Sequence, residues 1–360
     1  METKIVTLVL LCWLLLFPTC KKKPTEHNDT DKPGRRDYTW TIDTLSYPGS
    51  LQTTMRDMYA VDAKNIYVVG HNEDNGVGTM YHYDGTKWSS VKISWAVGGN
   101  ISGAFDLSAI YGFGANDIYA VGFRYHDNPT PPPNYYDSSL IIHFDGSQWK
   151  EVNLSVRGRQ LIGIWGNSSG DIWTGGGYGT LFHYDGILWA NVSLDTSLWF
   201  NAFGGEKYKQ FLTAYKQIDT SGYITGIKYL FKRIENNWTK VDSFALLPNT
   251  TFTFGHLNIR SIGGTIYSSG YGLFYQKNDK WENVESINDE TVIRYTFGSR
   301  SKNVYAVGNA GIVYHFNGTD WKKTDEVSNP ILSFNAGWTN EKEVFIMGDD
   351  NYRTYIYYGK

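Results

Sequence analysis

The chain has 360 residues, of which 16% are aromatic, 19% are charged and 38 are glycine. Many aromatic residues and glycines with few charges suit short strands joined by tight turns, so we expect an all-β fold. The formal net charge is −3, and residues 38–360 carry 26 Lys and Arg against 31 Asp and Glu, a net charge of −5. This acidic balance argues against a nucleic-acid partner.

The N-terminus begins with a short apolar segment. Residues 5–17 form an apolar run after Lys4, which matches the core of a secretory signal and is too short to span a bilayer comfortably. The run ends in Phe-Pro-Thr-Cys and three lysines follow, which resembles the lipobox of a bacterial lipoprotein. The resemblance implies a signal peptide over residues 1–19, a lipid on Cys20, and anchoring to the bacterial envelope, at its outer membrane. Ordinary signal cleavage and an uncleaved anchor are the alternatives.

Both cysteines, Cys12 and Cys20, lie in this N-terminal part. The remaining chain therefore has no thiol for a disulfide, a cysteine-ligated metal or a cysteine nucleophile. Residues 20–37 are polar and contain two prolines, which predicts a flexible tether. The folded body is then expected over residues 38–360.

This body repeats one pattern. A short apolar strand that ends in Gly is followed in most copies by an aromatic strand, a turn and a Trp, and another short strand precedes it. The apolar strand occurs seven times, beginning at Asn65, Asp117, Asp171, Gln210, Thr265, Asn303 and Glu343. Six copies reach the Trp, at Trp88, Trp149, Trp189, Trp238, Trp281 and Trp321. Four strands in about 40 residues are typical of a propeller blade, so we predict a seven-bladed β-propeller with four-stranded antiparallel blades.

The repeated phrase has a physical reason. In Asn-Val-Tyr-Ala-Val-Gly, residues 303–308, apolar side chains occupy both faces of the strand, as in a sheet packed between two other sheets. The Asp-Gly or Asn-Gly pair that follows favours a tight hairpin turn. One blade cannot bury both of its faces alone, so the same packing must recur around a ring.

The phrase resembles a propeller repeat of bacterial secreted and surface proteins, whose consensus is W-G-x-x-x-x-D-V-W-A-V-G followed by H-Y-D-G-x-x-W. The match is carried by segments such as Asn-Asp-Ile-Tyr-Ala-Val-Gly at 116–122 and His-Phe-Asp-Gly-Ser-Gln-Trp at 143–149. It covers about residues 52–360, is clear in repeats one, two, three and six, and is weak in repeats four and five. The resemblance implies the propeller fold and an extracytoplasmic location.

The last repeat is truncated. It stops at Lys360, before a fourth strand and its Trp, whereas residues 38–45 contain Trp40 in a setting like that of Trp321. We therefore predict that this N-terminal strand completes the last blade and closes the ring.

Histidines and aspartates recur within the pattern. His82, His143, His183 and His315 occupy one equivalent position in four blades, so we interpret them as half-buried strand residues and not as metal ligands. Turn aspartates precede Gly, where Asp has a backbone role; these are Asp84, Asp145 and Asp185.

No serine-hydrolase, zinc-protease or P-loop motif occurs, so we expect no enzymatic activity and no cofactor. Acidic loops of the first and last blades contain Glu73, Asp74, Asp349 and Asp350. Calcium binding there is the alternative to plain solvated loops.

Long insertions gather at one end of the predicted ring. They are residues 94–106, 122–139, 194–201 and 243–258, whereas the turns at the opposite end are short. Aromatic residues on these insertions are the candidate ligand-binding residues: Trp95, Tyr125, Tyr135, Tyr136 and Trp199. The alternative is that they only pack their own loops.

The sequence thus predicts a monomeric, envelope-tethered propeller that binds protein or carbohydrate without catalysis. A polysaccharide hydrolase or lyase acting on the same face is the alternative. Converging carboxylates in a polar pocket would favour the enzyme, and a shallow aromatic surface would favour the binding module.

Overall fold

The computed structural model describes residues 32–74, 76–155, 158–192, 194–217, 226–247, 249–288 and 290–360. The predicted signal peptide and the lipidation residue Cys20 lie outside these residues. Within the described part, Pro33–Lys360 belong to one compact unit, and no helix there has the length and apolar character that crossing a membrane requires.

The described strands form seven antiparallel sheets of four strands each, which we call blades 1–7. Their bounds are β2 (Thr53–Asp62), β3 (Asn65–Asn72), β4 (Met80–Tyr83) and β5 (Trp88–Ser90) in blade 1; β6 (Phe105–Gly114), β7 (Asp117–Asp127), β8 (Tyr135–Phe144) and β9 (Trp149–Glu151) in blade 2; β10 (Leu161–Ser168), β11 (Asp171–Gly176), β12 (Leu181–Tyr184) and β13 (Trp189–Asn191) in blade 3; β14 (Trp199–Glu206), β15 (Lys209–Gln217), β16 (Gly226–Ile234) and β17 (Asn237–Ala245) in blade 4; β18 (Asn258–Ile262), β19 (Thr265–Gly270), β20 (Gly272–Lys277) and β21 (Lys280–Asn283) in blade 5; β22 (Ile293–Arg300), β23 (Asn303–Gly308), β24 (Val313–Phe316) and β25 (Trp321–Lys323) in blade 6; β26 (Ser333–Thr339), β27 (Val344–Asp349), β28 (Thr354–Gly359) and β1 (Trp40–Leu45) in blade 7. Short 3-10 helices lie in connecting loops, at η2 (Trp95–Val97), η3 (Asn309–Gly311) and η4 (Asp325–Val327).

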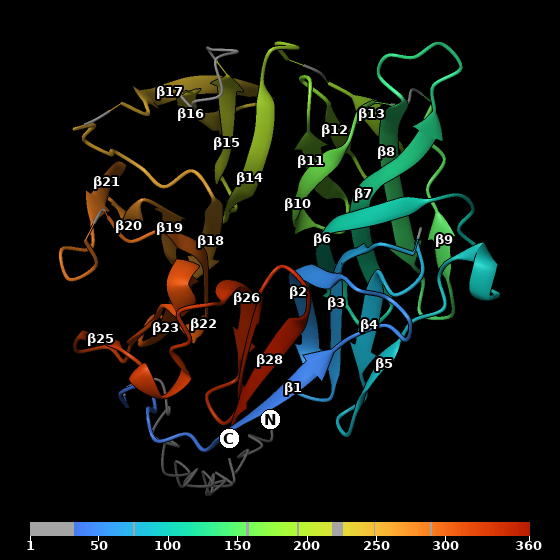
Figure 1. The fold of residues 1–360 in the computed structure, drawn as a ribbon. Coiled ribbons are helices and arrows are strands. Elements are labelled where there is room, and N and C mark those ends of the chain that lie inside the picture. The colour runs from blue at the N-terminus through green and yellow to red at the C-terminus, as the bar shows by residue number, and fades with distance from the viewer. Residues whose placement is uncertain are drawn as a thin grey trace, which may run out of the picture. The chain divides into compact units, whose positions relative to one another are not determined.

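The first strand of each blade lies innermost and contacts the first strands of its two neighbours (Figure 1). The contacts run in sequence from β2 through β6, β10, β14, β18 and β22 to β26, which contacts β2 again. The predicted all-β, seven-bladed propeller is therefore confirmed.

The ring closes as predicted from the truncated last repeat. Strand β1 pairs antiparallel with β28, with Trp40 opposite Gly359 and Leu45 opposite Thr354. Leu45 is buried. The N-terminal strand thus supplies the fourth strand of blade 7 and joins the two ends of the chain without a disulfide.

Each of the four recurrent histidines has a partner inside its own blade. The Nε2 atom of His143 lies 2.8 Å from Oδ1 of Asp117, and its ring stacks on Tyr119 at 4.2 Å between centroids. His315 repeats this arrangement with Asn303 at 2.7 Å and Tyr305 at 4.1 Å. Because carboxylate and amide oxygens only accept, Nε2 donates in each pair. Equivalent pairs join His82 to Asn65 and His183 to Asp171. All four histidines lie on strands as expected, but only three of them are half-buried, because His315 is 1% exposed.

The turn aspartates also act locally. The Oδ1 atom of Asp84 accepts the backbone N–H groups of Thr86 and Lys87 at 2.8 and 2.9 Å. Together with the Thr86 hydroxyl, these bonds lower the pKa of Asp84 to about 2. Only the glycine of the pair has a positive φ, 91° at Gly85, so the aspartate stabilises the turn by accepting N–H groups and not by adopting a left-handed conformation.

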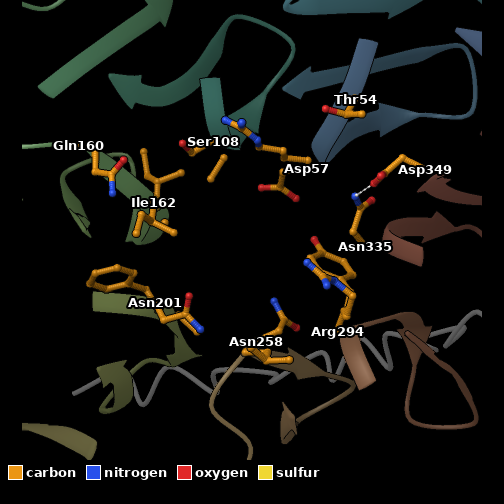
Figure 2. A pocket seen from close by; sticks show the side chains of 18 of the residues that line it. Thr54, Asp57, Ser108, Gln160, Ile162, Asn201, Asn258, Arg294, Asn335 and Asp349 are labelled. Carbon is orange, nitrogen blue, oxygen red and sulfur yellow. Dashed lines mark hydrogen bonds between the residues drawn. The ribbon is translucent and has the colours of Figure 1, made fainter. Parts of the chain in front are cut away.

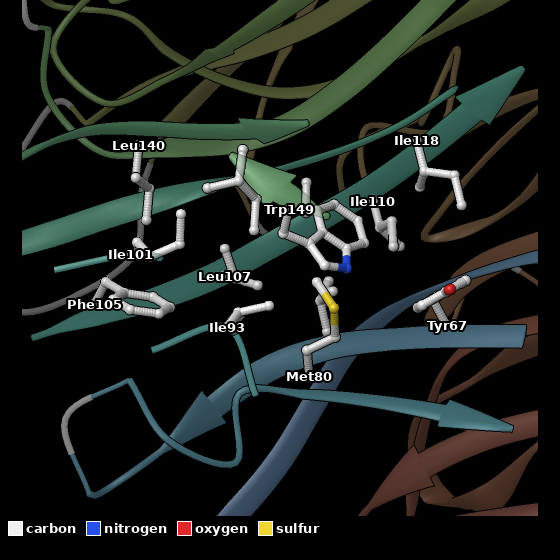
Figure 3. Packing of buried hydrophobic residues seen from close by; sticks show 13 residues of the cluster. Tyr67, Met80, Ile93, Ile101, Phe105, Leu107, Ile110, Ile118, Leu140 and Trp149 are labelled. Atoms are coloured by element: carbon white, nitrogen blue, oxygen red, sulfur yellow. The ribbon is translucent and has the colours of Figure 1, made fainter. Parts of the chain in front are cut away.

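The hydrophobic core lies between neighbouring blades. Figure 3 shows the cluster between blades 1 and 2, where Met80 and Tyr67 of one blade pack against Leu107 and Trp149 of the next. Trp149 is only 6% exposed. The recurrent Trp therefore fills the space between two blades, which explains its position in the repeat.

Candidate functional site

The two ends of the ring differ. At the short-turn face, the first strand of each blade turns into the second and the third into the fourth; at the long-loop face lie the remaining connections, including the insertions. The chain enters at the short-turn face, where the Gly34 N–H donates to the carbonyls of Lys302 and Asn317. Arg36 is fixed there by Asp320, at 2.9 Å. Residues 33–39 therefore lie at the short-turn face, whereas the segment after β1 reaches the long-loop face, where Gln52 lines the central cavity.

A polar cavity of about 600 Å³ opens at the centre of the ring, and all seven blades contribute to its lining. We call it the funnel. Figure 2 shows its side chains pointing inward, among them Asp57, Gln160, Asn201, Asn258 and Asn335. Its residues come from the beginnings of the innermost strands and from loops of the long-loop face, so the funnel lies on that side of the ring.

A β-bulge in the first strand places one funnel residue in each of six blades. The register between first and second strands skips one residue, for example between Met55 and Asp57 in blade 1 and between Phe334 and Ala336 in blade 7. The skipped residues all line the funnel: Arg56, Ser108, Ile162, Asn201, Arg294 and Asn335. Bulges re-aim side chains. Blade 5 has no such shift and contributes Asn258 and Arg260, which are alternate residues of one strand face.

The positions around each bulge differ in what they tolerate. The residue before the bulge is apolar and fully buried in all six blades: Met55, Leu107, Leu161, Phe200, Ile293 and Phe334. The bulge residue itself varies among Arg, Ser, Ile and Asn. The fold therefore constrains the core position, whereas the side chain at the bulge is free to serve recognition.

Deep in the funnel, a charged cluster ties several blades together. Asp57 of blade 1 accepts the N–H groups of Met58 and of Ile110 in blade 2, at 2.9 and 3.0 Å. Burial raises the pKa of Asp57, although the positive charge of Arg260 acts in the opposite direction. The Arg260 guanidinium donates to the Tyr295 hydroxyl and lies 5.0 Å from the centre of that ring. The cluster links blades 1, 2, 5 and 6.

A second network lies between blades 1 and 2. The buried carboxylate of Asp106 accepts from His71 Nδ1 at 2.8 Å, from Tyr125 Oη at 3.2 Å and from Arg56 Nη2 at 3.3 Å. His71 Nε2 faces Oε1 of Gln52 at 3.1 Å. Burial and the Asp106 charge raise the pKa of Tyr125 to about 12. The positive charge of Arg56 is therefore balanced by a carboxylate.

A third group of funnel side chains comes from blades 6 and 7. Arg294 is exposed, and its Nη1 donates to Oδ1 of Asn309 at 3.3 Å. Asn335 donates to the Met55 carbonyl and to Asp349 Oδ2, which leaves its own buried Oδ1 without a partner among the described residues. Asp349 Oδ1 accepts the Asn351 N–H at 3.0 Å, and burial raises the pKa of Asp349.

None of the predicted aromatic residues lines the funnel. Tyr125 and Tyr135 lie on one face of the β7–β8 hairpin and are 41% and 62% exposed, whereas Tyr136 lies on the opposite face and stacks on His126 at 4.9 Å. Trp95 lies in η2 and is 76% exposed.

Trp199 begins β14 in blade 4. Its ring packs against Tyr178 at 5.1 Å and Tyr215 at 6.0 Å, so it takes part in local packing. The structure thus brings the three tyrosines together on one hairpin, while Trp95 and Trp199 belong to other elements.

The acidic loop residues are engaged locally. Glu73 accepts the Leu51 N–H, and Asp350 accepts the Tyr355 hydroxyl and the Arg353 N–H. Within the described ranges, no three His, Cys, Asp or Glu side chains are close enough together to hold a metal ion.

The sequence reasoning missed the bulge residues. A signal existed in the sequence. Each bulge residue directly follows a buried apolar residue, near the start of the short strand that precedes the Gly-ending strand of the repeat. Aligning the repeats at that apolar residue would have shown a variable, mostly polar column beside a column that is always apolar.

No family model and no curated protein matches this chain. Among solved structures, YCF48 bound to a D1 peptide is similar, with 14% identity, a TM-score of 0.58, and coverage of 91% of this chain and 97% of that one. YCF48 from Cyanidioschyzon merolae has 12% identity, a TM-score of 0.55 and coverage of 88% and 98%. The WD40 propeller domain of Doa1 has 10% identity, a TM-score of 0.51 and coverage of 88% and 96%. These similarities show the fold, which is that of a β-propeller.

Proposed function

We propose that this chain is an envelope-tethered lipoprotein whose propeller is a non-enzymatic binding module for glycan or protein, with the funnel and its surrounding long-loop face as the binding surface. The observation that carries the proposal is the set of six bulge residues around the funnel, which we call the bulge ring. Six blades repeat one backbone device that points a side chain into the funnel, and the side chains it presents differ from blade to blade. Such variation at a structurally equivalent position suits recognition of an asymmetric ligand.

The state of the funnel carboxylates supports binding over catalysis. Both oxygens of Asp57 accept backbone N–H groups, and both oxygens of Asp349 accept N–H groups of Asn351 and Asn335. A general acid or base needs an oxygen directed at the substrate. YCF48, which has the same fold, has been solved with a D1 peptide bound, which supports a polymeric partner for this chain.

A lipid on Cys20 would suit this geometry. The chain joins the propeller at the short-turn face, so a tether attached there leaves the funnel side accessible. The test is a Cys20→Ala substitution with fractionation and labelling by a fatty-acid probe. We expect the wild type to be labelled and to lie in the membrane fraction, and the variant to be unlabelled and to lie outside it. If the variant were retained on membranes as well as the wild type, and the wild type were not labelled, lipidation would be contradicted.

Binding is tested with a glycan array and an affinity pull-down, using the wild type and an Asn201→Ala, Arg294→Ala variant of the funnel. The matched control is Arg353→Ala, which removes an exposed charge in the β27–β28 loop outside the funnel lining. Ligands lost by the funnel variant and kept by the control would support the proposal. Ligands that both variants keep would place binding elsewhere.

The alternative is a polysaccharide hydrolase or lyase in the same funnel. One observation favours it: burial raises the pKa of both Asp57 and Asp349, as general acids require. The test is release of reducing ends or of unsaturated sugars from a panel of polysaccharides. Activity that is lost in Asp349→Asn but kept in the neighbouring Asp350→Asn would establish the enzyme.

A further inference from the structure

The three arginines that line the funnel differ in how their charge is balanced. Arg56 lies 3.3 Å from the Asp106 carboxylate, and Arg260 is partly buried beside Tyr295 and near Asp57. Arg294 has no carboxylate within ion-pair distance among the described residues, although its charge acts on Asp349 from farther away, and its only hydrogen bond there is the 3.3 Å contact to Asn309. An exposed guanidinium presents a planar set of donors that matches a carboxylate in two parallel hydrogen bonds. The funnel therefore has one open position for a negatively charged ligand group.

The rest of the lining includes six amides and three hydroxyls, besides eight apolar or glycine residues and the carboxylates of Asp57 and Asp349. Within the described structure, Gln160 has no side-chain hydrogen bond, Asn201 uses only Nδ2, at 2.7 Å from the His256 carbonyl, and Asn258 uses only Oδ1, at 3.3 Å from the Thr296 N–H. Open donors and open acceptors thus alternate around the wall. A hydroxyl both donates and accepts, so a ligand covered with hydroxyls satisfies this wall better than one with apolar side chains.

An aromatic strip leads outward from the funnel. Phe123 lines the funnel, and Tyr125 and Tyr135 continue along the same face of the β7–β8 hairpin. Both tyrosines are substantially exposed. Aromatic faces of this kind pack against the apolar faces of sugar rings, so the strip offers room for further units of a chain whose end enters the funnel.

From these contacts we infer that the funnel binds an acidic sugar, a uronate unit of a glycan, with its carboxylate on Arg294 and its hydroxyls on Gln160, Asn201 and Asn258. The inference rests on the proposed binding function and narrows it to one class of ligand. An acidic peptide is the competing source of a carboxylate; it offers fewer hydroxyls for the amide wall, so the lining favours the sugar.

The test is calorimetric titration of the full chain, purified in detergent. The probes are oligomers of galacturonate, glucuronate and mannuronate, the methyl esters of the same oligomers, and an oligoglutamate peptide. We expect one of the uronate series to bind, and its methyl ester to bind about 10- to 100-fold more weakly, because charge-assisted hydrogen bonds to the carboxylate are lost. Arg294→Ala should weaken binding of the acid by a similar factor and leave binding of the ester unchanged.

Two controls make the result specific. Arg353→Ala removes the same charge from the same face outside the funnel and should leave the affinity unchanged, and the melting temperatures of both variants should equal that of the wild type. Equal affinities for acid and ester, equal losses in both variants, or tighter binding of oligoglutamate than of any uronate would overturn the inference. If no uronate binds while a neutral glycan or a protein binds at the funnel, the inference fails and the proposed function stands. If nothing binds to the long-loop face, both fail.

Discussion

Asp57 offers the most direct test of how the centre of the ring is held together. The residue is 9% exposed, and its carboxylate accepts N–H groups from Met58 in blade 1 and Ile110 in blade 2. It also faces the positive charge of Arg260 from blade 5. An Asp57→Ala substitution removes all three interactions, and the small methyl group restores none of them.

The expected loss of stability follows from these contacts. A buried N–H group left without a partner costs about 1–3 kcal/mol, and a buried charge that loses its counter-charge costs about 3–5 kcal/mol. Because burying the carboxylate is itself unfavourable, part of these costs is recovered when it is removed. We therefore expect the free energy of unfolding to fall by about 3–5 kcal/mol, and the melting temperature by about 4–7 °C in a domain of this size.

The measurement is thermal unfolding followed by circular dichroism, with denaturant titration where unfolding is reversible. Asp43→Ala, on the exposed edge strand β1, is the matched control and should change stability by less than about 0.5 kcal/mol. A double variant, Asp57→Ala with Arg260→Met, should lose less than the sum of the two single losses, because neither charge is then left alone. Additive losses, or an Asp57→Ala variant as stable as the control, would refute the role given to this cluster.

Three further predictions concern closure, acid stability and the binding face. Deleting residues 38–45 should lower the melting temperature far more than deleting residues 21–31, since only the first removes the fourth strand of blade 7; equal effects would contradict closure by β1. Burial, with a smaller contribution from a nearby arginine, lowers the pKa of His315 from 6.5 to about 3. Below pH 6.5, His315 is therefore protonated in the unfolded chain but stays neutral in the native state. The free energy of unfolding then decreases as the pH falls from 6.5 toward 3. His315→Gln should flatten this loss in denaturant titrations between pH 3 and 6.5, and an unchanged slope would argue against it. A Tyr135→Ala, Tyr136→Ala variant should keep the wild-type melting temperature and bind an identified ligand more weakly, whereas unchanged affinity would remove the hairpin from the binding surface.

The fold was predictable because its determinants repeat. The Trp that fills the space between blades, the His that stacks on a strand aromatic, and the Asp-Gly turn each recur at a fixed position, so several weak local signals support one architecture. Closure by β1 was predictable for the same reason, since a repeat that lacks one strand implies where that strand must come from. The prediction needed no knowledge of loops, whose conformations depend on individual contacts.

The funnel was harder to predict because it depends on register. A strand such as Met55–Met58 has no residue type that marks a bulge, and without the bulge Arg56 would be read as one member of a regular alternation. Sequence reasoning instead selected exposed aromatic residues on long insertions. That choice identified residues of the β7–β8 hairpin. It could not recognise that Trp199 packs between Tyr178 and Tyr215, because those partners lie in the β11–β12 loop and on β15.

The bulge ring also explains why so regular a repeat says little about the ligand. In a regular strand, a change at one residue alters the packing of a buried face, so the repeat keeps these positions apolar. At a bulge, the extra residue leaves the alternation, and its side chain can change from Arg to Ser to Asn while the preceding Met, Leu or Phe stays buried. Recognition can then change one blade at a time without loss of the ring. The positions that define the fold therefore stay apolar in every blade. The information about the ligand lies in the bulge residues, whose type the repeat does not fix.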